Sequence, residues 1–299
     1  MKKIGIIGLG NMGIGMAKNL IQHGFEVAGF DLRKDCLNAL ADLGGKPVHT
    51  ITDVGEISEA VFVMVLNGAQ VKEVVLGKQG LIQSLAPGTT IIVTATIHPS
   101  EIIELASPLT EKGINLIDSP VSGGKPGADK CTLTLMAATD AAVLKGAQSA
   151  MEAVGKNIYH VGEEIGLGQK TKASLQALIG SSFTAIFESL VLGVKAGVKP
   201  EVLYEVFSAS GVGSPLFRNA AQLIMDRSFK DTGSHIGTMY KDLGITMQMA
   251  KDNGAAMFTT AAAFELFRSG ISLYPEEDNW AIVKLLEQIA GTEVKAYSH

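Results

Sequence analysis

The chain has 299 residues, of which 46% are hydrophobic and 18% charged. Because a chain of this length is longer than a single hydrophobic core usually supports, we expect two domains. The formal net charge is −5, and a mildly acidic surface repels phosphate backbones, which argues against nucleic acid as a partner. The two cysteines, Cys36 and Cys131, are too few for a disulfide framework and indicate reduced thiols, so we expect a cytoplasmic protein.

Up to about residue 162, short apolar segments alternate with helical patterns. Several of the short segments are rich in Val and Ile and apolar throughout, which is typical of strands buried on both faces of a mainly parallel sheet. These segments are residues 3–7, 26–30, 60–66, 90–93, 115–117, 132–137 and 157–161. Helical patterns lie between them, at 13–23, 34–43 and 99–112. The β-α order predicts an α/β domain with a doubly wound sheet.

The pattern changes after Gly168. Residues 169–196 have the pattern of one long helix that ends before Gly197 and Pro200. Helical patterns then follow at 201–209, 216–226, 236–253, 257–269 and 279–291, and we expect no strand beyond 161. We therefore predict an N-terminal domain of residues 1–163 and an all-helical domain of residues 164–299, with the long helix between the domains.

One segment must be tested as a membrane span, because residues 173–187 carry no charge. These 15 residues fall short of the roughly 20 that cross a bilayer, and polar side chains interrupt them. At the N-terminus, glycines and an asparagine interrupt the apolar run before a signal peptide could form. We expect a buried helix between domains and no membrane association.

A glycine-rich motif follows the first predicted strand and opens the first predicted helix, which is the context that gives such a motif its value. Gly8 permits a tight turn, Gly10 lets the backbone approach a pyrophosphate, and Gly13 allows the helix to pack closely on the strand. The helix N-terminus offers free N–H groups to the phosphates. The predicted cofactor-binding turn consists of Gly8, Leu9, Gly10, Asn11, Met12 and Gly13.

An acidic residue, Asp31, ends the second predicted strand, 18 residues after Gly13. A carboxylate there can accept hydrogen bonds from the adenosine ribose hydroxyls and would repel a 2′-phosphate, which favours NAD over NADP. Arg33 and Lys34 follow closely and could partly restore NADP binding. The sequence thus predicts a Rossmann-type domain that binds NAD.

Four blocks of sequence together resemble the β-hydroxyacid dehydrogenases, a family that includes 3-hydroxyisobutyrate dehydrogenase, tartronate semialdehyde reductase, L-threonate dehydrogenase and sulfolactaldehyde reductase. The resemblance implies hydride transfer between NAD(H) and a small, three- or four-carbon hydroxy acid or its aldehyde or keto partner. It also implies that the helical domain serves substrate binding and assembly into homodimers or homotetramers. The blocks are the glycine turn with Met16-Ala17 and Asn19-Leu20, residues 118–124, Gly166-Leu167-Gly168 with Lys172, and Lys241-Asp242-Leu243.

Two of these blocks suggest where a substrate would bind. Ser122, Gly123 and Gly124 can expose backbone N–H groups and a hydroxyl to a carboxylate, although a tight loop without a ligand is equally consistent with the residues alone. The resemblance implies carboxylate binding there. Lys172 lies one turn into the long helix, and a lysine in an apolar setting can exchange a proton with a substrate hydroxyl. The resemblance implies that Lys172 is the catalytic general acid and base.

The resemblance assigns further contacts, with two departures from the family pattern. It implies that Asn67, Thr96 and Lys241 contact the cofactor, with Lys241 at the nicotinamide end, and that Gln176 binds substrate. Val65-Leu66 stands where the family usually has Leu-Pro before Asn67. Leu175 stands where an asparagine or histidine is common, so either the pocket is more apolar or Ser174 substitutes.

Alternatives to this hydroxyacid dehydrogenase function are an NAD-binding regulatory module without turnover and an imine reductase-like enzyme on the same scaffold. The retained lysine weighs against both. We expect no metal site, because the histidines are scattered and lack metal-ligand spacing. The histidines are His23, His49, His98, His160, His235 and His299.

Overall fold

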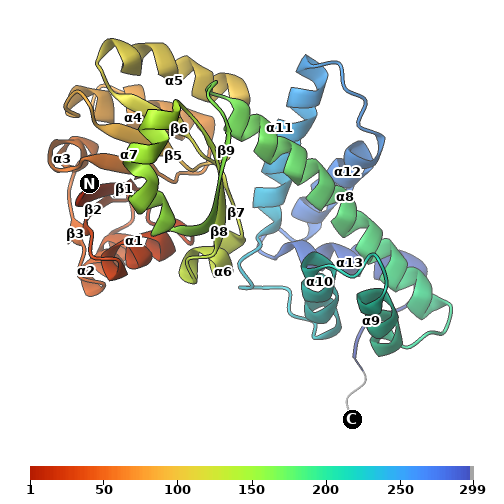
Figure 1. Ribbon diagram of the computed structural model, residues 1–299. Helices are drawn as coiled ribbons and strands as arrows, with labels where there is room; N and C mark the ends of the chain where they lie inside the picture. The colour runs from red at the N-terminus through yellow and green to blue at the C-terminus, as the bar shows by residue number, and fades with distance from the viewer. Residues whose placement is uncertain (297–299) are drawn as a thin grey trace. The chain divides into compact units, whose positions relative to one another are not determined.

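The computed structural model of the protein describes residues 1–296 and divides into two compact units. The first unit is Met1–Lys172, and the second begins at Ala173. Helices and strands alternate in the first unit, whereas the described part of the second unit is helical apart from one isolated bridge between His235 and Asp278 (Figure 1). The expected combination of an α/β domain, a long helix and a helical domain is confirmed.

The first unit is built on a nine-stranded sheet with the order β3-β2-β1-β4-β5-β6-β8-β7, in which β9 also pairs with β8. The strands from β3 to β6 are parallel, whereas β8 runs antiparallel to both β6 and β7. The strands are β1 (Lys3–Ile7), β2 (Glu26–Phe30), β3 (Lys46–Pro47), β4 (Ala60–Val63), β5 (Thr90–Val93), β6 (Asn115–Asp118), β7 (Val121–Ser122), β8 (Leu133–Ala138) and β9 (Gly155–Gly162).

Helices cover both faces of this sheet (Figure 1). In β1, Ile4 and Ile6 face one apolar core and Ile7 faces the other, because successive strand residues point to opposite faces. The first core includes residues of α1, α2 and α7, and the second includes residues of α3, α4 and α5. The helices are α1 (Gly13–Gln22), α2 (Lys34–Asp42), α3 (Ile51–Ile57), α4 (Gly68–Leu76), α5 (Pro99–Glu111), α6 (Gly124–Asp129) and α7 (Ala141–Glu152).

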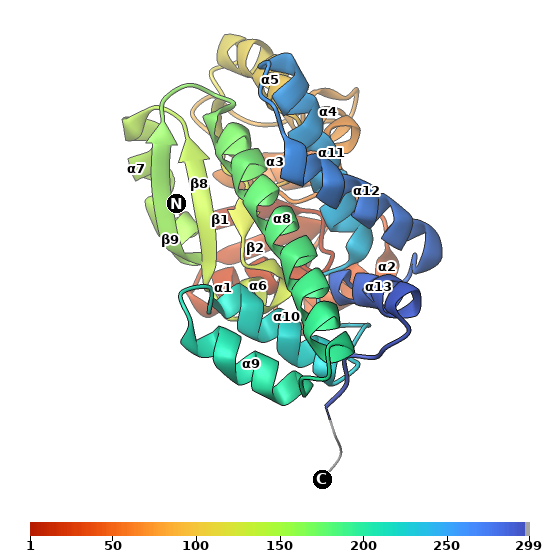
Figure 2. The same ribbon diagram turned by 90° about the vertical axis from the view of Figure 1, so that its right-hand side faces the viewer.

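The second unit packs its helices around aromatic side chains. Phe183 stands edge-on to Trp280 with ring centroids 5.3 Å apart, and Phe187 is fully buried beside them. Figure 2 shows α11 and α12 lying side by side. The helices are α8 (Leu167–Lys195, which begins in the first unit), α9 (Pro200–Ala209), α10 (Pro215–Met225), α11 (Ile236–Asp252), α12 (Phe258–Leu273) and α13 (Ile282–Ala290).

The long helix α8 begins and ends within two residues of its predicted range, but it is less buried than its sequence suggested. The helix is long and apolar enough to cross a membrane, and 28% of an apolar stretch of 18 residues within it is buried inside the protein. Phe183, Phe187 and Leu190 pack into the aromatic core, whereas Leu178 and Leu192 are 66% and 71% exposed. An apolar run without charges does not reveal how many faces of a helix are covered.

Several elements were absent from the predictions, namely β3, β7, α3, α4, α6 and α7. The start of α3 carries a recognisable signal, since Thr50 and Asp53 form a capping box. Strand β4 ends at Val63 rather than at 66, and α12 continues to Leu273 rather than ending at 269. The two-residue strands β3 and β7 form by pairing with neighbouring strands. Two residues are too few to show an alternation of apolar and polar side chains in the sequence.

The aromatic core gives the first prediction. Phe187→Ala removes a fully buried ring and should lower the free energy of unfolding by about 3–5 kcal/mol. Ser189→Ala at an exposed position of the same helix should change it by no more than about 0.5 kcal/mol. Urea unfolding followed by circular dichroism measures both variants, and equal losses would contradict the assignment of the two faces.

Candidate functional site

The glycine turn joins β1 to α1, and packing accounts for two of its three glycines. Gly8 has φ +90°, and a Cβ there would lie 2.3 Å from the Met64 carbonyl oxygen. A Cβ on Gly13 would lie 1.8 Å from the Gly8 oxygen. On Gly10, by contrast, the nearest atom would be Nη2 of Arg33 at 3.4 Å. Contacts within the protein therefore do not require a glycine at position 10, but close approach of a ligand to the backbone would.

The first turn of α1 is suited to phosphate. No side chain in the described chain caps this helix, and its first turn holds no acidic residue. Ile14 N donates to the Gly10 carbonyl oxygen, and the other N–H groups of the first turn and the positive end of the helix dipole are available to an anion. The residues present thus fit a dinucleotide held by this turn.

Asp31 follows β2 and faces the same turn. One carboxylate oxygen accepts a hydrogen bond from Leu9 N at 2.8 Å, and the other accepts from Arg33 N at 2.9 Å and from Arg33 Nε at 3.3 Å. Partial burial opposes ionisation, but the Arg33 and Leu9 amides and the Arg33 side chain bring the pKa of Asp31 below its usual value. The ionised carboxylate keeps further lone pairs for ribose hydroxyls.

Two other predicted cofactor residues follow neighbouring strands. Asn67 comes after β4, and its side chain accepts from Gln70 N at 2.9 Å, so it caps α4. Thr96 comes after β5. Because β2, β1, β4 and β5 are parallel, the glycine turn, Asp31, Asn67 and Thr96 all lie at the carboxyl edge of the sheet, where α/β proteins bind ligands.

The predicted carboxylate loop spans the junction of β7 and α6. Gly123 has φ +130° and Gly124 has φ +57°, conformations that favour glycine. Such successive glycines can turn consecutive N–H groups toward one anion. Ser122, which is half-buried, is the last residue of β7, and Gly124 is the first residue of α6.

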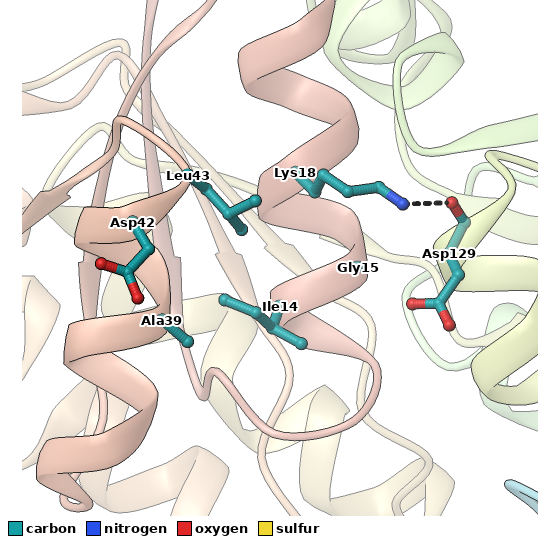
Figure 3. Close-up of a pocket in the computed structure, with 7 residues that line it drawn as sticks. All are labelled: Ile14, Gly15, Lys18, Ala39, Asp42, Leu43 and Asp129. Atoms are coloured by element: carbon teal, nitrogen blue, oxygen red, sulfur yellow. Dashed lines mark hydrogen bonds between the residues drawn. The ribbon is translucent and has the colours of Figure 1, made fainter.

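Helix α6 is attached to α1, the helix that opens at the glycine turn. Lys18 Nζ donates to the Asp129 carbonyl oxygen at 2.8 Å (Figure 3), and buried Asn19 donates to the Ala128 carbonyl oxygen. Gly15 permits the close approach, since a Cβ there would lie 2.9 Å from the Ala128 carbonyl carbon. The predicted cofactor turn and carboxylate loop therefore belong to two helices that are fixed to each other.

A hollow of about 310 Å³ lies beside this contact, between α1, α2 and α6 (Figure 3). None of the residues predicted to bind cofactor or substrate lines it. The cofactor site is therefore assigned from the glycine turn and not from this hollow. The lining residues are Ile14, Gly15, Lys18, Ala39, Asp42, Leu43 and Asp129.

Lys172 is buried, 6% exposed, one turn into α8. The start of this helix is fixed by Asp118, the last residue of β6, which is fully buried. Its Oδ2 accepts from Gly166 N at 2.9 Å and from Gln169 N at 3.2 Å, and its Oδ1 accepts from Gln169 Nε2 at 3.0 Å. Asp118 lay inside a block that the sequence singled out, but neither its role nor Gln169 was predicted.

The remaining two predicted site residues lie in the second unit. Gln176 Nε2 donates to Asp242 Oδ2 at 2.6 Å, and Lys241 Nζ lies 2.8 Å from Asp242 Oδ1. Gln176 and Asp242 are buried, and Gln176 Oε1 has no hydrogen-bond partner within the described chain. Asp242 thus fixes the amide so that an acceptor oxygen is left for another group. The sequence named Asp242 only as a neighbour of Lys241.

No group of three or more His, Cys, Asp or Glu side chains within residues 1–296 is placed to hold a metal ion. His299, one of the six histidines considered above, lies outside the described residues.

The buried carboxylate gives the second prediction. Burial raises the pKa of Asp118 to about 6, although hydrogen bonds from Gln169, Gly166 and Gly168 favour the ionised form. Since this pKa lies above that of an unfolded chain, protonation stabilises the native state below about pH 4, and this contribution is lost as the pH rises through about 6. Between about pH 5 and pH 8 the wild type should lose about 1 kcal/mol more unfolding free energy than Asp118→Asn.

The measurement is urea unfolding of both proteins across that pH range. Asp140→Asn is the matched control, because Asp140 caps α7 in the same unit with an exposed carboxylate and the variant keeps Asp118 in place. This control should follow the wild type. Parallel pH profiles for the wild type and Asp118→Asn would rule out the elevated pKa.

Comparison with known proteins identifies both parts of the chain. Residues 3–162 match the family described as the NAD binding domain of 6-phosphogluconate dehydrogenase, and residues 166–286 match the family described as NAD-binding of NADP-dependent 3-hydroxyisobutyrate dehydrogenase. The 2-(hydroxymethyl)glutarate dehydrogenase of Eubacterium barkeri is 34% identical over 294 residues, with 98% of this chain and 97% of that protein covered.

Two further relatives agree with this. The L-threonate dehydrogenase of Cupriavidus necator is 32% identical over 289 residues, covering 96% of this chain and 97% of that protein. The crystal structure of a 3-hydroxyisobutyrate dehydrogenase from Salmonella typhimurium superimposes with a TM-score of 0.87 at 28% identity, covering 95% of this chain and all of that one. All three relatives are named as dehydrogenases, which favours an enzyme with turnover over a regulatory module. The chain therefore belongs to the β-hydroxyacid dehydrogenase family and is an NAD-binding oxidoreductase of small hydroxy acids.

Proposed function

We propose that Lys172 is the general acid and base of this dehydrogenase and that the loop of Ser122, Gly123 and Gly124 holds the substrate carboxylate. The observation that carries the proposal is the burial of Lys172 directly after a helix start that Asp118 fixes. A buried amine on a rigid helix can be kept within reach of a reacting hydroxyl, which general acid–base catalysis requires.

Oxidation of the carbinol removes a hydride from carbon and a proton from oxygen. When bound, NAD would supply the hydride acceptor. Neutral Lys172 Nζ accepts the hydroxyl proton as the carbonyl double bond forms, and in the reducing direction the ammonium returns that proton to the carbonyl oxygen. Ser122 and the N–H groups of Gly123 and Gly124 hold the carboxylate, which orients the carbinol carbon.

In this proposal, the backbone from Gly8 to Gly13 holds the dinucleotide. Asp31 accepts hydrogen bonds from the ribose, which favours NAD, and Thr96 and Asn67 border the cofactor at the same sheet edge. Arg33 is paired with Asp31 at 3.3 Å, so its guanidinium is already engaged beside the turn.

Two further residues, both in the second unit, have proposed ligand contacts. Gln176 Oε1 accepts a hydrogen bond from a substrate hydroxyl, because Asp242 already holds the amide N–H₂. Lys241, paired with Asp242, contacts the nicotinamide end of the cofactor. The substrates of the three named relatives, 2-(hydroxymethyl)glutarate, L-threonate and 3-hydroxyisobutyrate, form the panel from which the substrate of this enzyme is to be sought.

The protein acts as a soluble enzyme, and we place it in the cytoplasm as a homodimer or homotetramer. Large apolar side chains exposed on the second unit, which include Leu192 at 71%, Phe258 at 87% and Ile289 at 75%, support a subunit contact there. Light scattering of the purified chain distinguishes dimer, tetramer and monomer.

The third prediction tests the role of Lys172. Lys172→Ala removes the proposed proton acceptor and should lower kcat by roughly 10²–10⁴-fold on whichever acid of the panel turns over fastest, while NADH binding stays within about threefold. Turnover is followed by NADH absorbance and binding by NADH fluorescence.

Lys170→Ala is the control, because Lys170 is an exposed lysine two positions away on the same helix. It should keep wild-type turnover. Near-normal kcat in Lys172→Ala would remove Lys172 from the mechanism.

A further inference from the structure

Asp118 acts as a helix cap that is distant in sequence. The N–H groups of Gly166 and Gln169 at the start of α8 are satisfied by a carboxylate 48 and 51 residues earlier in the chain. A local cap would fix the helix only to its own preceding loop. Because Asp118 ends β6, this cap fixes the start of α8 to the sheet.

Gln169 extends the attachment to a second loop. Its Nε2 donates to the Ala95 carbonyl oxygen at 3.1 Å, and its Oε1 accepts from Ile97 N at 3.0 Å. The amide therefore pairs with the backbone on both sides of Thr96, as a neighbouring strand would. The conformation of the loop proposed to border the cofactor is set from α8.

The contact leaves little room for displacement. A Cβ on Gly168 would lie 2.6 Å from the Asp118 carbonyl oxygen and 2.7 Å from the Met136 carbonyl oxygen, so the first turn of α8 packs directly on the backbone of β6 and β8. Lys172 follows Gly168 by one helical turn. The proposed carboxylate loop begins at Ser122, four residues after Asp118.

We propose that Asp118 and Gln169 form a positioning pair, which sets Lys172 relative to the Thr96 loop and to the Ser122–Gly124 loop. The inference rests on the proposed role of Lys172 and concerns the first unit alone. Burying a carboxylate costs free energy, and an apolar residue would pack there without that cost. What the buried carboxylate provides is a fixed position for Lys172. This position is important because a displacement of about 1 Å at a reacting group can lower the rate about 10²-fold.

Asp118→Asn tests the pair. It places an amide N–H₂ where a carboxylate oxygen accepted hydrogen bonds, so the first turn of α8 should shift. We expect kcat to fall about 10²-fold, while the NADH dissociation constant and the substrate KM stay within about threefold. Asp140→Asn, which alters the exposed cap of α7 in the same unit, should keep wild-type kcat.

The decisive readout is the same substitution in a Lys172→Ala background. If Asp118 acts through Lys172, Asp118→Asn should lower the residual kcat no further, whereas a merely structural loss would multiply with that of Lys172→Ala. A full multiplicative loss, or wild-type kcat in Asp118→Asn alone, would overturn the inference. If instead the proposed catalytic role of Lys172 is wrong, the result is different, because Lys172→Ala alone then keeps a near-normal kcat.

A second variant tests the pairing itself. Asp118→Asn combined with Gln169→Glu exchanges the amide and carboxylate, so the hydrogen bond between the two side chains and the one from Ile97 N can re-form, whereas the bond to the Ala95 carbonyl oxygen is lost. We expect this double variant to recover at least about tenfold in kcat over Asp118→Asn. A loss equal to the product of the two single losses would contradict a paired role.

Discussion

The burial of one carboxylate at the junction of β6 and α8 is the constraint on which the proposed site depends. Asp118 accepts hydrogen bonds from the first turn of α8, and its pKa rises to about 6 as a consequence of burial. The interaction joins the sheet to the helix that carries Lys172. Without it, the helix start would be held by packing and by the hydrogen bonds of Gln169 to the Thr96 loop, with no hydrogen bond to β6.

A second set of contacts relates the two loops of the first unit that are proposed to bind cofactor and substrate. The glycine turn opens α1, and α1 is hydrogen bonded through Lys18 and Asn19 to the end of α6. Helix α6 in turn follows the proposed carboxylate loop. The parallel strands bring Asp31 and Thr96 to the same edge. The residues proposed to hold cofactor and substrate are therefore positioned by the sheet and by the contacts between α1 and α6, rather than by any single motif.

The sequence predicted those parts of the fold and site whose cause is local. Strand 3–7 and the turn at Gly8 are determined by an apolar run and by backbone crowding within a few residues, and both were predicted within their observed bounds. Helix α8 was predicted within two residues because Gly197 and Pro200 mark its end. Strand β7, two residues long, exists only through pairing with β8 and leaves no local signal.

The parts of the site that the sequence did not predict depend on contacts across the chain. Gln169 binds Asp118 over 51 residues and Ala95 over 74 residues, and nothing at position 169 alone indicates either partner. Asn67 has a capping role for α4 in addition to its predicted contact with the cofactor. The orientation of Gln176 follows from Asp242, 66 residues later.

The central claim is that a fixed amine at position 172 moves the substrate proton. Chemical rescue tests it most directly: Lys172→Ala is assayed with added primary amines that differ in basicity. We predict that added amines restore part of the kcat and that the restored kcat rises with amine basicity, because a free amine can then accept the hydroxyl proton. A variant that binds NADH normally yet shows no rescue by any small amine would contradict the claim.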